Sequence, residues 1–497
     1  MSHIYPDATE IEINKVMRDA AIAFLEYKKF SHEQKAGFLE TIALEIESLG
    51  DALIIRASEE TNLSHARLTG ERGRTCMQLR MFADMLREGS WVDATIITAE
   101  PERQPLPRQD FRKMLYPVGP VIVFGASNFP FAYSTAGGDT ASALASGCPV
   151  VVKAHPAHPD TSESVYHAIR SAIEKCGMPT NLFQHVHGKE IATGRLLVQH
   201  PETAAVGFTG SLAGGRALYD YAGQRDYPIP VFAEMGSVNP VILFPGALEK
   251  NSKSLAQQYA ASITLGMGQF CTNPGIIIAI DSHPLNDFIL QLSEEISRVI
   301  PEKMLHPGIH QAYNDRMQKA LSQKNVQLVK HSSNQAGLLE GRPTLACVDG
   351  SSFLQEPFLH EEVFGPYSLL VKCKDMTELV KVWVSLKGQL STSLMATDED
   401  LANYPSVLDT ALEIAGRVVF NQVPTGVEVC SAMMHGGSYP ASTDSRFSAV
   451  GIHAVKRWLR PVCFQNCPSY LLPDELKDDN PGKIWRSVNN VPSKDKI

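Results

Sequence analysis

Apolar residues recur at helical spacing through the first part of the chain. They repeat every three or four positions in the segments MRDAAIAFLEYKKF and AGFLETIALEIESL, within residues 8–60, and again over residues 71–87. Ser31 precedes the second segment in the position of a helix N-cap. This pattern predicts a helical start. Residues 89–116 combine prolines with short β-branched runs such as TIIT, so they predict an extended hairpin that leaves the main body.

From residue 118 onward, short apolar runs alternate with helical segments. The first runs are PVIVFG, PVVVK and AVGFTG, with helical periodicity near residues 134–147 and 161–176. A second set includes PVILF, GIIIAI, YSLLVK and STSLMAT, with a helix expected over 284–299. Strands that alternate with helices are typical of parallel, doubly wound sheets. The pattern therefore predicts an α/β fold with two such domains.

The length of 497 residues is too great for one ordinary hydrophobic core, which agrees with a division into several units. The changes in pattern predict a first domain over 1–88 and 117–235, a second over 236–457, a bridging arm over 89–116 and 458–470, and a C-terminal tail over 471–497. We expect the last ten residues to be loosely held. Hairpin arms often mediate assembly, so the arm is the predicted site of contacts between copies of the chain.

Composition and charge exclude several classes of protein. The 45 basic and 54 acidic residues give a net charge of -9, and no basic cluster favours nucleic acid as a partner. The uncharged stretch Leu115–Gly138 is long enough to cross a bilayer, but Pro117, Pro120 and Pro130 would break a helix there, which argues against a membrane partner. The first residues lack the basic and apolar parts of an export signal, so we expect a cytoplasmic protein.

The cysteines predict free thiols. Nine are spread along the chain, and only Cys463 and Cys467 lie close together in sequence. A protein of this size does not need disulfides to stabilise its core. We therefore expect no disulfide framework and no metal site.

Several short motifs place reactive or polar residues at the ends of predicted strands or in loops. They are Lys153 in PVVVKAHPAHP, Gly210, Ser211 and Gly215 in AVGFTGSLAGG, Glu234 in FAEMGS, and Cys271 in GMGQFCTNPG. Strand ends of such sheets face the ligand crevice, and a glycine turn before a helix offers amide groups to phosphate. Taken singly, each motif also has a structural interpretation, such as a buried inert cysteine or an exposed glutamate.

Taken together, the motifs resemble the aldehyde dehydrogenase superfamily. SNFP, FTGS, E-x-G, G-Q-x-C and EEVFGP occur in the order and at the separations of that family, and the resemblance covers roughly residues 10–470. It implies two doubly wound α/β domains with a bridging β-hairpin that mediates oligomerisation. The first domain would bind the cofactor, and the second would carry the reactive thiol. A homodimer or homotetramer is the implied assembly.

The resemblance also implies a catalytic set. Cys271 corresponds to the nucleophile that attacks the aldehyde carbonyl, and Asn128 to the amide that, with the Cys271 backbone N–H, holds the oxyanion. After hydride transfer to the nicotinamide, Glu234 corresponds to the general base for the water that hydrolyses the thioester. Members that pass the acyl group to coenzyme A generally lack this glutamate, so Glu234 favours release of a free acid.

Further residues match the cofactor contacts of the family. Glu362 corresponds to the carboxylate at the nicotinamide ribose, with Phe364 beside it. Lys153 corresponds to the lysine at the adenosine ribose, and Gly210, Ser211 and Gly215 to the pyrophosphate contacts. Pro156 stands where NAD-preferring members tend to carry a glutamate, and Arg195 could add positive charge nearby or could simply be exposed. The resemblance therefore implies that NADP is preferred and NAD is possible.

The substrate is the least specific part of the resemblance. Ala136 stands where succinate-semialdehyde enzymes tend to place an arginine, and the stretch ARLTGERGRTCMQLR resembles the tunnel mouth of the family. Of its arginines, Arg74 is our choice by spacing for a substrate carboxylate, and Phe129 is expected in the same tunnel. The stretches HGGSYPASTDSRFSAVG and RWLRPVCFQN replace the more usual FGGxxxSG and resemble the branch that oxidises α-ketoglutarate semialdehyde (2,5-dioxopentanoate).

Three alternatives to that activity remain at this point. The first is an NADP-dependent dehydrogenase for fatty or other apolar aldehydes. The second is a catalytically idle member with a structural or cofactor-binding role. The third is a cysteine hydrolase that pairs Cys271 with one of the sixteen histidines.

Overall fold

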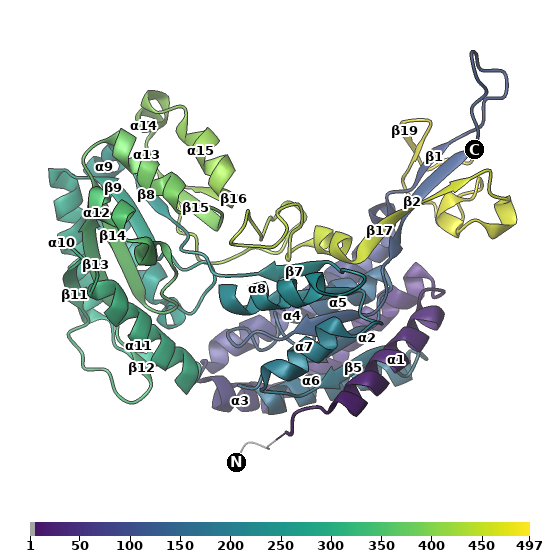
Figure 1. The fold of residues 1–497 in the computed structure, drawn as a ribbon, viewed down its shortest axis with the longest axis horizontal. Coiled ribbons are helices and arrows are strands. Elements are labelled where there is room, and N and C mark those ends of the chain that lie inside the picture. The colour runs from purple at the N-terminus through teal and green to yellow at the C-terminus, as the bar shows by residue number, and fades with distance from the viewer. Residues whose placement is uncertain (1–4) are drawn as a thin grey trace.

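The computed structural model describes residues 5–497 and shows two α/β domains with a projecting arm (Figure 1). The purple N-terminal helices and the strands β3 to β7 form the first domain, and the teal to green segments from β8 to β16 form the second. The yellow C-terminal residues return past the first domain into the arm. The predicted fold class is confirmed.

The first domain is built on a five-stranded parallel sheet in the order β5-β4-β3-β6-β7. Its strands are β3 (Val121–Phe124), β4 (Val150–Lys153), β5 (Phe183–Val186), β6 (Ala205–Thr209) and β7 (Val231–Glu234). Because all five strands are parallel, Lys153 and Glu234, the last residues of β4 and β7, both lie at the carboxyl ends of the strands. Ligands of such folds bind at these ends.

Helices cover both faces of this sheet. Alternation along β3 assigns the faces, because Val121 and Val123 point into one apolar core and Ile122 and Phe124 into another. The first core contains α2 (His32–Ser48), α3 (Gly50–Thr61), α4 (His65–Glu88), α5 (Gly138–Ser146) and α6 (Pro159–Lys175). The second contains α1 (Glu10–Tyr27), α7 (Ile191–Gln199) and α8 (Leu212–Gly223). Ser31 caps α2 as predicted, and its hydroxyl accepts the Gln34 N–H.

The second domain carries a seven-stranded sheet in the order β11-β13-β14-β9-β8-β15-β16. The strands are β8 (Val241–Leu243), β9 (Ile276–Ile280), β11 (Gln327–His331), β13 (Thr344–Asp349), β14 (Tyr367–Cys373), β15 (Gln389–Met395) and β16 (Ala415–Phe420). Only β11 among these pairs antiparallel, at the edge. A two-stranded pair, β10 (Glu302–Lys303) and β12 (Glu340–Gly341), lies apart from this sheet.

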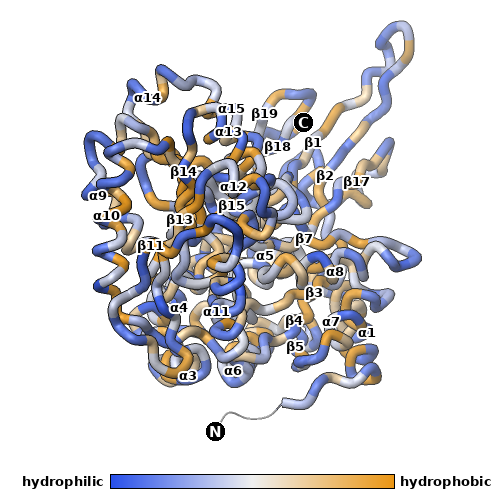
Figure 2. The backbone as a smooth tube through the Cα atoms, turned by 60° about the vertical axis from the view of Figure 1, so that its left-hand side comes forward, coloured by the Kyte–Doolittle hydropathy of each residue, from blue (hydrophilic) through white to orange (hydrophobic). Residues whose placement is uncertain are grey.

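The helices of the second domain also divide between two faces. Ile277 and Ala279 pack against α9 (Pro245–Thr264) and α10 (His283–Arg298). Ile276 and Ile278 pack in the core of α11 (Pro307–Leu321), α12 (Gly350–Gln355), α13 (Met376–Ser385) and α15 (Val407–Ile414). The remaining short elements are α14 (Asp398–Asn403), η2 (Leu265–Gly268) and η3 (Pro357–His360). In Figure 2 the strands around β13 and β14 are strongly hydrophobic, as expected for a sheet covered on both faces.

The arm is a five-stranded sheet that includes the C-terminus. Its order is β17-β2-β1-β18-β19, with β1 (Thr95–Ile97), β2 (Phe111–Pro117), β17 (Leu459–Gln465), β18 (Arg486–Val488) and β19 (Val491–Ser493). Short turns of 3₁₀-helix flank it at η1 (Ser90–Val92), η5 (Ser469–Leu471) and η6 (Asp474–Leu476). The prediction that the last ten residues are loosely held is therefore wrong, because β19 lies among them and pairs with β18, and the Ile497 N–H donates to the Asp478 carbonyl.

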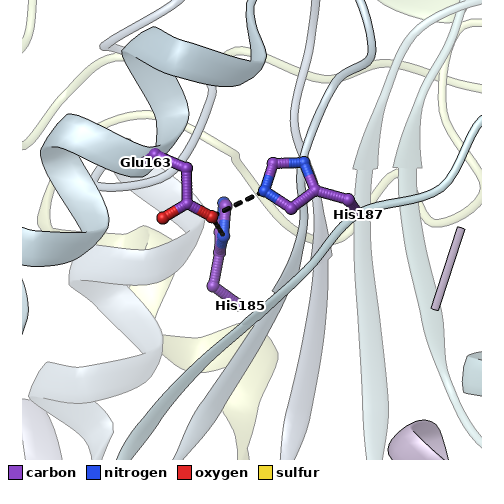
Figure 3. Close-up of side chains that lie close together, drawn as sticks. All are labelled: Glu163, His185 and His187. Atoms are coloured by element: carbon purple, nitrogen blue, oxygen red, sulfur yellow. Dashed lines mark hydrogen bonds and ion pairs between the residues drawn. The ribbon is translucent and has the colours of Figure 1, made fainter. Parts of the chain in front are cut away.

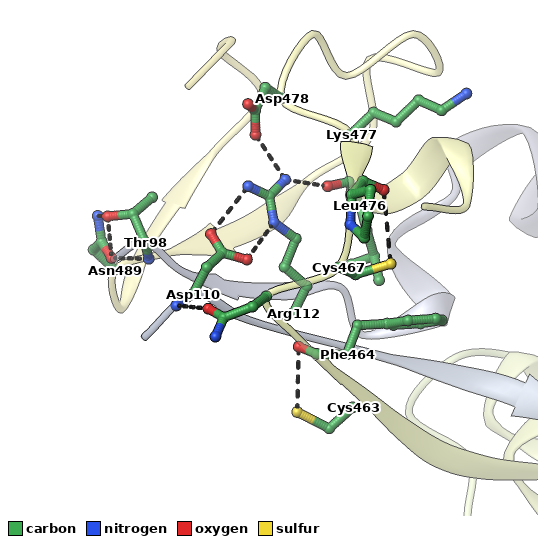
Figure 4. Close-up of polar contacts among 12 residues, drawn as sticks. Thr98, Asp110, Arg112, Cys463, Phe464, Cys467, Leu476, Lys477, Asp478 and Asn489 are labelled. Carbon is green, nitrogen blue, oxygen red and sulfur yellow. Dashed lines mark hydrogen bonds and ion pairs between the residues drawn. The ribbon is translucent and has the colours of Figure 1, made fainter. Parts of the chain in front are cut away.

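A buried arginine attaches that tail to the arm. The Arg112 guanidinium donates to the Leu476 carbonyl and to the Asp478 carboxylate, both at 2.6 Å, and to the Asp110 carboxylate at 2.9 Å (Figure 4). Asn489 also binds the arm, since its side-chain oxygen accepts the Thr98 N–H at 3.0 Å. The sequence did not reveal the contacts with Leu476, Asp478 and Asn489, because these residues lie more than 350 positions from their partners in the chain.

The predicted end of the second domain also needs correction. Residues 236–457 were assigned to it, but η4 (Ile452–Trp458) packs against α5, and Ala454, Val455 and Trp458 belong to the core of the first domain. The Trp458 indole N–H donates to the Ser142 hydroxyl at 2.8 Å. The chain thus returns to the first domain before it enters the arm.

Among residues 5–497, no helix combines the length and apolar character needed to cross a bilayer. The uncharged stretch Leu115–Gly138 instead contains parts of β2 and α5 and all of β3. The cytoplasmic location stays a prediction.

Candidate active site

The loop that carries Cys271 has an unusual backbone. Gly266, Met267 and Gly268 have φ values of 52°, 55° and 62°, in the left-handed region. A Cβ on residue 268 would lie 2.2 Å from the Gly365 carbonyl oxygen, so only glycine fits at this position. Met267 adopts the same region without the freedom of glycine, which marks this loop as locally strained.

A buried amide holds this loop in place. The Asn239 side-chain N–H₂ donates to the Cys271 carbonyl at 2.8 Å and to the Asn273 carbonyl at 2.9 Å. Its oxygen accepts the Ser391 hydroxyl at 2.9 Å, from strand β15. Because Asn239 is fully buried, its polar atoms need these partners, and the thiol loop is tied to the second sheet through them.

Cys271, His435 and Glu234 form a chain of side-chain contacts. The Cys271 sulfur lies 3.4 Å from His435 Nε2, and the other ring nitrogen of His435, Nδ1, donates to the Glu234 carboxylate. Glu234 is the last residue of β7 in the first domain, whereas Cys271 precedes β9 in the second. The imidazole and the carboxylate are buried.

The charge on His435 follows from this pairing. Burial alone would lower the pKa of His435, but Glu234, with smaller contributions from Tyr133 and Cys271, raises that pKa well above its usual value. The imidazole is therefore cationic at neutral pH, and one of its N–H groups faces the sulfur. A thiol beside an imidazolium is the arrangement that favours a reactive thiolate.

Sequence reasoning missed His435. The signal was present, because histidine starts the segment HGGSYP where the more usual pattern FGGxxxSG has phenylalanine. Nothing in the pattern indicated that this histidine would lie between two residues 164 and 201 positions away.

Asn128 lies at the thiol loop as well. Its side-chain N–H₂ donates to the Gln269 carbonyl at 3.2 Å, two residues before Cys271. Its own carbonyl accepts an N–H of Arg67 at 2.6 Å. The structure thus brings together Cys271, Glu234 and Asn128, which the sequence singled out separately.

An aromatic wall with a cation stands beside this loop. The Phe129 ring packs edge-on to Phe270 at 5.7 Å and to Tyr133 at 5.3 Å between centroids. The Arg67 guanidinium lies over both phenylalanines, 5.0 Å from Phe129 and 4.6 Å from Phe270. Phe129 therefore lies next to the thiol loop, and its contact with the substrate stays a prediction.

Arg74 approaches the same place through Tyr133. Its guanidinium lies 5.9 Å from the Tyr133 ring centre, and that ring lies 6.1 Å from the His435 ring. Nε and Nη2 of Arg74 are buried and make no hydrogen bond within the chain. By contrast, Arg72 donates to the Gly50 carbonyl, and Arg80 makes a two-point ion pair with Glu47. Of the arginines on α4, Arg74 and Arg67 thus have buried donors that remain available to a ligand.

A second guanidinium near the thiol was not foreseen. Arg417, on β16, donates to the carbonyls of Gly426, at 2.9 Å, and Pro424. Burial lowers the pKa of Arg417, whereas Cys271 and Tyr133 act in the opposite direction, so the cation lies within electrostatic reach of both. The sequence offered only an arginine at the start of the apolar run RVVFNQ.

Glu362 and Phe364 lie on a hollow next to the thiol loop, which Ser237 and Gly268 also line. Burial raises the pKa of Glu362 to about 7. A Cβ on residue 236 would lie 2.6 Å from a Glu362 carboxylate oxygen, so Gly236 leaves room for that side chain. A carboxylate in such a hollow fits the paired hydroxyls of a nucleotide ribose. The neighbouring Glu361 is exposed and pairs with Arg316 at 2.7 Å.

The other predicted cofactor residues lie at the carboxyl edge of the first sheet. Lys153 ends β4 half-buried. Ser211 caps α8, where its hydroxyl accepts the Gly214 N–H at 3.2 Å, and Gly210 precedes it. Gly215 has a packing reason to be glycine, because a Cβ there would lie 2.7 Å from Met235. The start of α8 thus offers amide groups to a pyrophosphate, as a helix N-terminus does.

Two features bear on the choice of cofactor. Pro156 is exposed. Arg195 donates to Gln199 at 2.9 Å, and its guanidinium lies 5.5 Å from the Tyr221 ring, so its contacts are those of a surface arginine. Burial lowers the pKa of Lys153, and the negative charge of Asp7 raises it, so the Asp7 carboxylate lies near that lysine. The Asp7 side chain accepts the Lys189 and Glu190 N–H groups at 2.9 Å and 2.8 Å. Sequence reasoning missed Asp7.

Comparisons with known proteins match one family over most of the chain. The model of the aldehyde dehydrogenase family matches residues 3–460. The chain is 45% identical to an alpha-ketoglutaric semialdehyde dehydrogenase of Acinetobacter baylyi, over 98% of this chain and 93% of that one. It is 46% identical to alpha-ketoglutaric semialdehyde dehydrogenase 2 of Azospirillum brasilense, over 97% and 92%.

A solved structure shares the fold. It is the glyceraldehyde-3-phosphate dehydrogenase GapN of Methanocaldococcus jannaschii complexed with NADP, which superposes with a TM-score of 0.78 at 17% identity. The match covers 93% of this chain and 95% of that one.

Proposed function

Because the chain belongs to the aldehyde dehydrogenase family, we propose that it oxidises α-ketoglutarate semialdehyde to α-ketoglutarate, with NADP preferred over NAD. The observation that carries the substrate is the 45–46% identity, over nearly the whole chain, to two enzymes with that name. The buried guanidinium groups near the thiol supply a physical reason, because this substrate has a carboxylate at the end remote from the aldehyde.

In the proposed reaction the Cys271 thiolate attacks the aldehyde carbonyl. The His435 imidazolium, 3.4 Å away, stabilises the thiolate before attack. The Asn128 amide is the side-chain donor for the oxyanion, and the loss of one such donor typically costs about 10²- to 10³-fold in rate. When bound, the nicotinamide would supply the acceptor for the hydride that leaves the former carbonyl carbon, which then becomes the carbon of a thioester with Cys271. Glu234 accepts the proton of the water that hydrolyses the resulting thioester, and His435 orients its carboxylate.

We assign the cofactor contacts to Glu362 and to the residues at the carboxyl ends of the strands of the first sheet. The α8 N-terminus with Gly210, Ser211 and Gly215 would hold the pyrophosphate, and Lys153 the adenosine ribose. The proposed NADP preference rests on Lys153 and on the absence of a carboxylate at Pro156. Arg195 is proposed only to add positive charge near the adenosine ribose. Asp7 would weaken the preference for NADP, because its negative charge lies near Lys153.

The substrate carboxylate is proposed to bind Arg74, with Arg417 as a second cation. Arg74 has buried donors without a partner in the chain, and both arginines flank Tyr133. Two cations suit an α-keto acid, because its carboxylate and keto oxygen can each accept hydrogen bonds. Phe129 would pack against the carbon chain.

Two alternatives have specific support. Phe129, Tyr133 and Val429 belong to one apolar cluster beside the site, which would suit an apolar aldehyde. The chain from Cys271 through His435 to Glu234 also has the geometry of a thiol hydrolase. Family membership favours the dehydrogenase over the hydrolase, and the buried Arg74 donors without a hydrogen-bond partner favour the semialdehyde over the apolar substrate.

The arm is the proposed surface for a homodimer or a homotetramer. Its outer strands β17 and β19 stand at the two ends of the strand order. Its exposed apolar side chains include Leu106, Tyr470, Leu471, Trp485 and Val491.

The proposed activity predicts the ranking of substrates. Initial rates of absorbance rise at 340 nm, compared at matched concentrations, should be highest for α-ketoglutarate semialdehyde, lower for succinate semialdehyde and lowest for a long-chain aldehyde. NADP should give a higher kcat/KM than NAD. Rates that rise with aldehyde chain length would instead support the apolar alternative. Ester turnover without any cofactor reduction would support the hydrolase.

The arginine assignment predicts a loss confined to the charged substrate. Arg74→Ala should raise KM for α-ketoglutarate semialdehyde about 10- to 100-fold, the usual effect of losing hydrogen bonds to a charged group, and should change KM for an uncharged aldehyde little. Arg417→Lys, which keeps the charge, should raise KM less than Arg417→Met. Arg80→Ala on the same helix is the matched control. Equal losses on both substrates would contradict the assignment.

The role of His435 predicts a change in the pH profile. Because Glu234 raises the pKa of His435, the imidazole is cationic at neutral pH and loses its charge only as the pH rises through that raised pKa. His435→Asn should therefore lower kcat/KM about 10²-fold at pH 7 and remove the fall in kcat/KM at high pH that follows from deprotonation of His435. His435→Phe tests the residue that is usual for the family. His360→Asn, a half-buried histidine of η3, is the control. A folded His435→Asn protein with an unchanged pH profile would refute the role.

The assembly proposal predicts the mass in solution. Light scattering should give two or four times the chain mass of 54.5 kDa. A mass of 54.5 kDa at micromolar concentration would contradict it.

A further inference from the structure

Two histidines and a glutamate converge in the first domain, apart from the thiol site. Glu163 lies on α6, His185 on β5, and His187 directly after that strand. Figure 3 shows both imidazoles turned toward the carboxylate. Successive side chains of a strand point to opposite faces of the sheet. Val186 points to one face, so His185 and His187 point to the other face together with Phe183, and this is the face that α6 covers.

One carboxylate oxygen meets both rings. Glu163 Oε1 lies 3.1 Å from His185 Nδ1 and 2.6 Å from His187 Nε2. These three atoms lie within 4.8 Å of one another. The second oxygen, Oε2, lies 3.5 Å from Nε2 of His167, one turn further along α6. Imidazole nitrogen and carboxylate oxygen are ligands that Zn²⁺ prefers.

Neighbouring groups fix the orientation of the buried ring. The His185 side chain is 1% exposed, and its other nitrogen, Nε2, lies 2.7 Å from the Ser162 hydroxyl. Ser162 in turn contacts the Thr135 hydroxyl at 2.5 Å. The ring of His185 also stacks on Tyr166, with 5.2 Å between centroids. A histidine that donates its second N–H to a fixed acceptor is typical of metal ligands.

The other side of the cluster is partly exposed. The His187 ring stacks on Tyr5 at 4.0 Å, and its side chain is 14% exposed. His167 is 72% exposed, so it can turn toward the cluster or leave that position to water. A tetrahedral ion held by these three residues would take its fourth ligand from His167 or from water.

We propose that Glu163, His185 and His187 bind one Zn²⁺ ion, with a structural role. The ion would join α6 to β5, which is the edge strand of the first sheet and pairs only with β4. Because β4 ends in Lys153, the ion would stabilise the part of the domain that is proposed to hold the adenosine ribose. This inference departs from the expectation of no metal site, which rested on the cysteines alone.

The test measures binding directly in the full chain. Cys271→Ser protein, stripped of metal by a chelator, is titrated with zinc sulfate in a calorimeter, because the Cys271 thiol beside His435 would itself bind zinc. We expect one equivalent to bind and the thermal unfolding midpoint to rise. His187→Gln in the same background should bind zinc at least about 10-fold more weakly and lose that rise.

Two further variants keep the test decisive. His283→Gln removes an exposed histidine that pairs with Asp287 on α10, and it should leave the affinity unchanged. Ser162→Ala, which removes the partner of His185 without touching a ligand, should weaken binding about 10- to 100-fold, and it replaces His187→Gln if that protein does not fold. No binding at one equivalent, or equal affinity in His187→Gln, would overturn the proposal, since the cluster would then be a hydrogen-bond network only.

Discussion

The contact between the Glu234 carboxylate and the His435 imidazole organises the centre of this protein. Both groups are buried, and a buried charge is tolerated only when it is paired. The pair therefore requires the end of β7, the segment that returns from the second domain, and the thiol loop to meet at one place. This one requirement brings Cys271 to the interface of two sheets that are otherwise built independently.

The surrounding backbone is shaped to permit that meeting. Gly268 passes so close to the Gly365 carbonyl that a side chain is impossible, and Asn239 satisfies two carbonyls of the thiol loop. Asn128 reaches the same loop from the turn after β3. Rigid sheets thus supply the positions, and the loops between them supply the reacting groups, as is usual for α/β enzymes.

Local physics made much of the fold predictable from the sequence. Apolar runs of four to seven residues become the parallel strands, and periods of three to four become helices such as α2, α6 and α10. The C-terminal residues were misjudged because their stability comes from partners such as Arg112, far away in the chain. Likewise, η4 looked like part of the second domain because sequence order does not show which core a segment joins.

For the site, the sequence alone was enough to single out Cys271, Glu234, Asn128 and Glu362, because each stands in a short motif with its own spacing. Only the tertiary structure decided that His435 links two of them, that Arg417 lies within electrostatic reach of Cys271, and that Glu163 meets His185 and His187. The physical reason is distance along the chain. Motifs record neighbours in sequence, whereas pairing of buried charge depends on neighbours in space, which the packing of two domains creates.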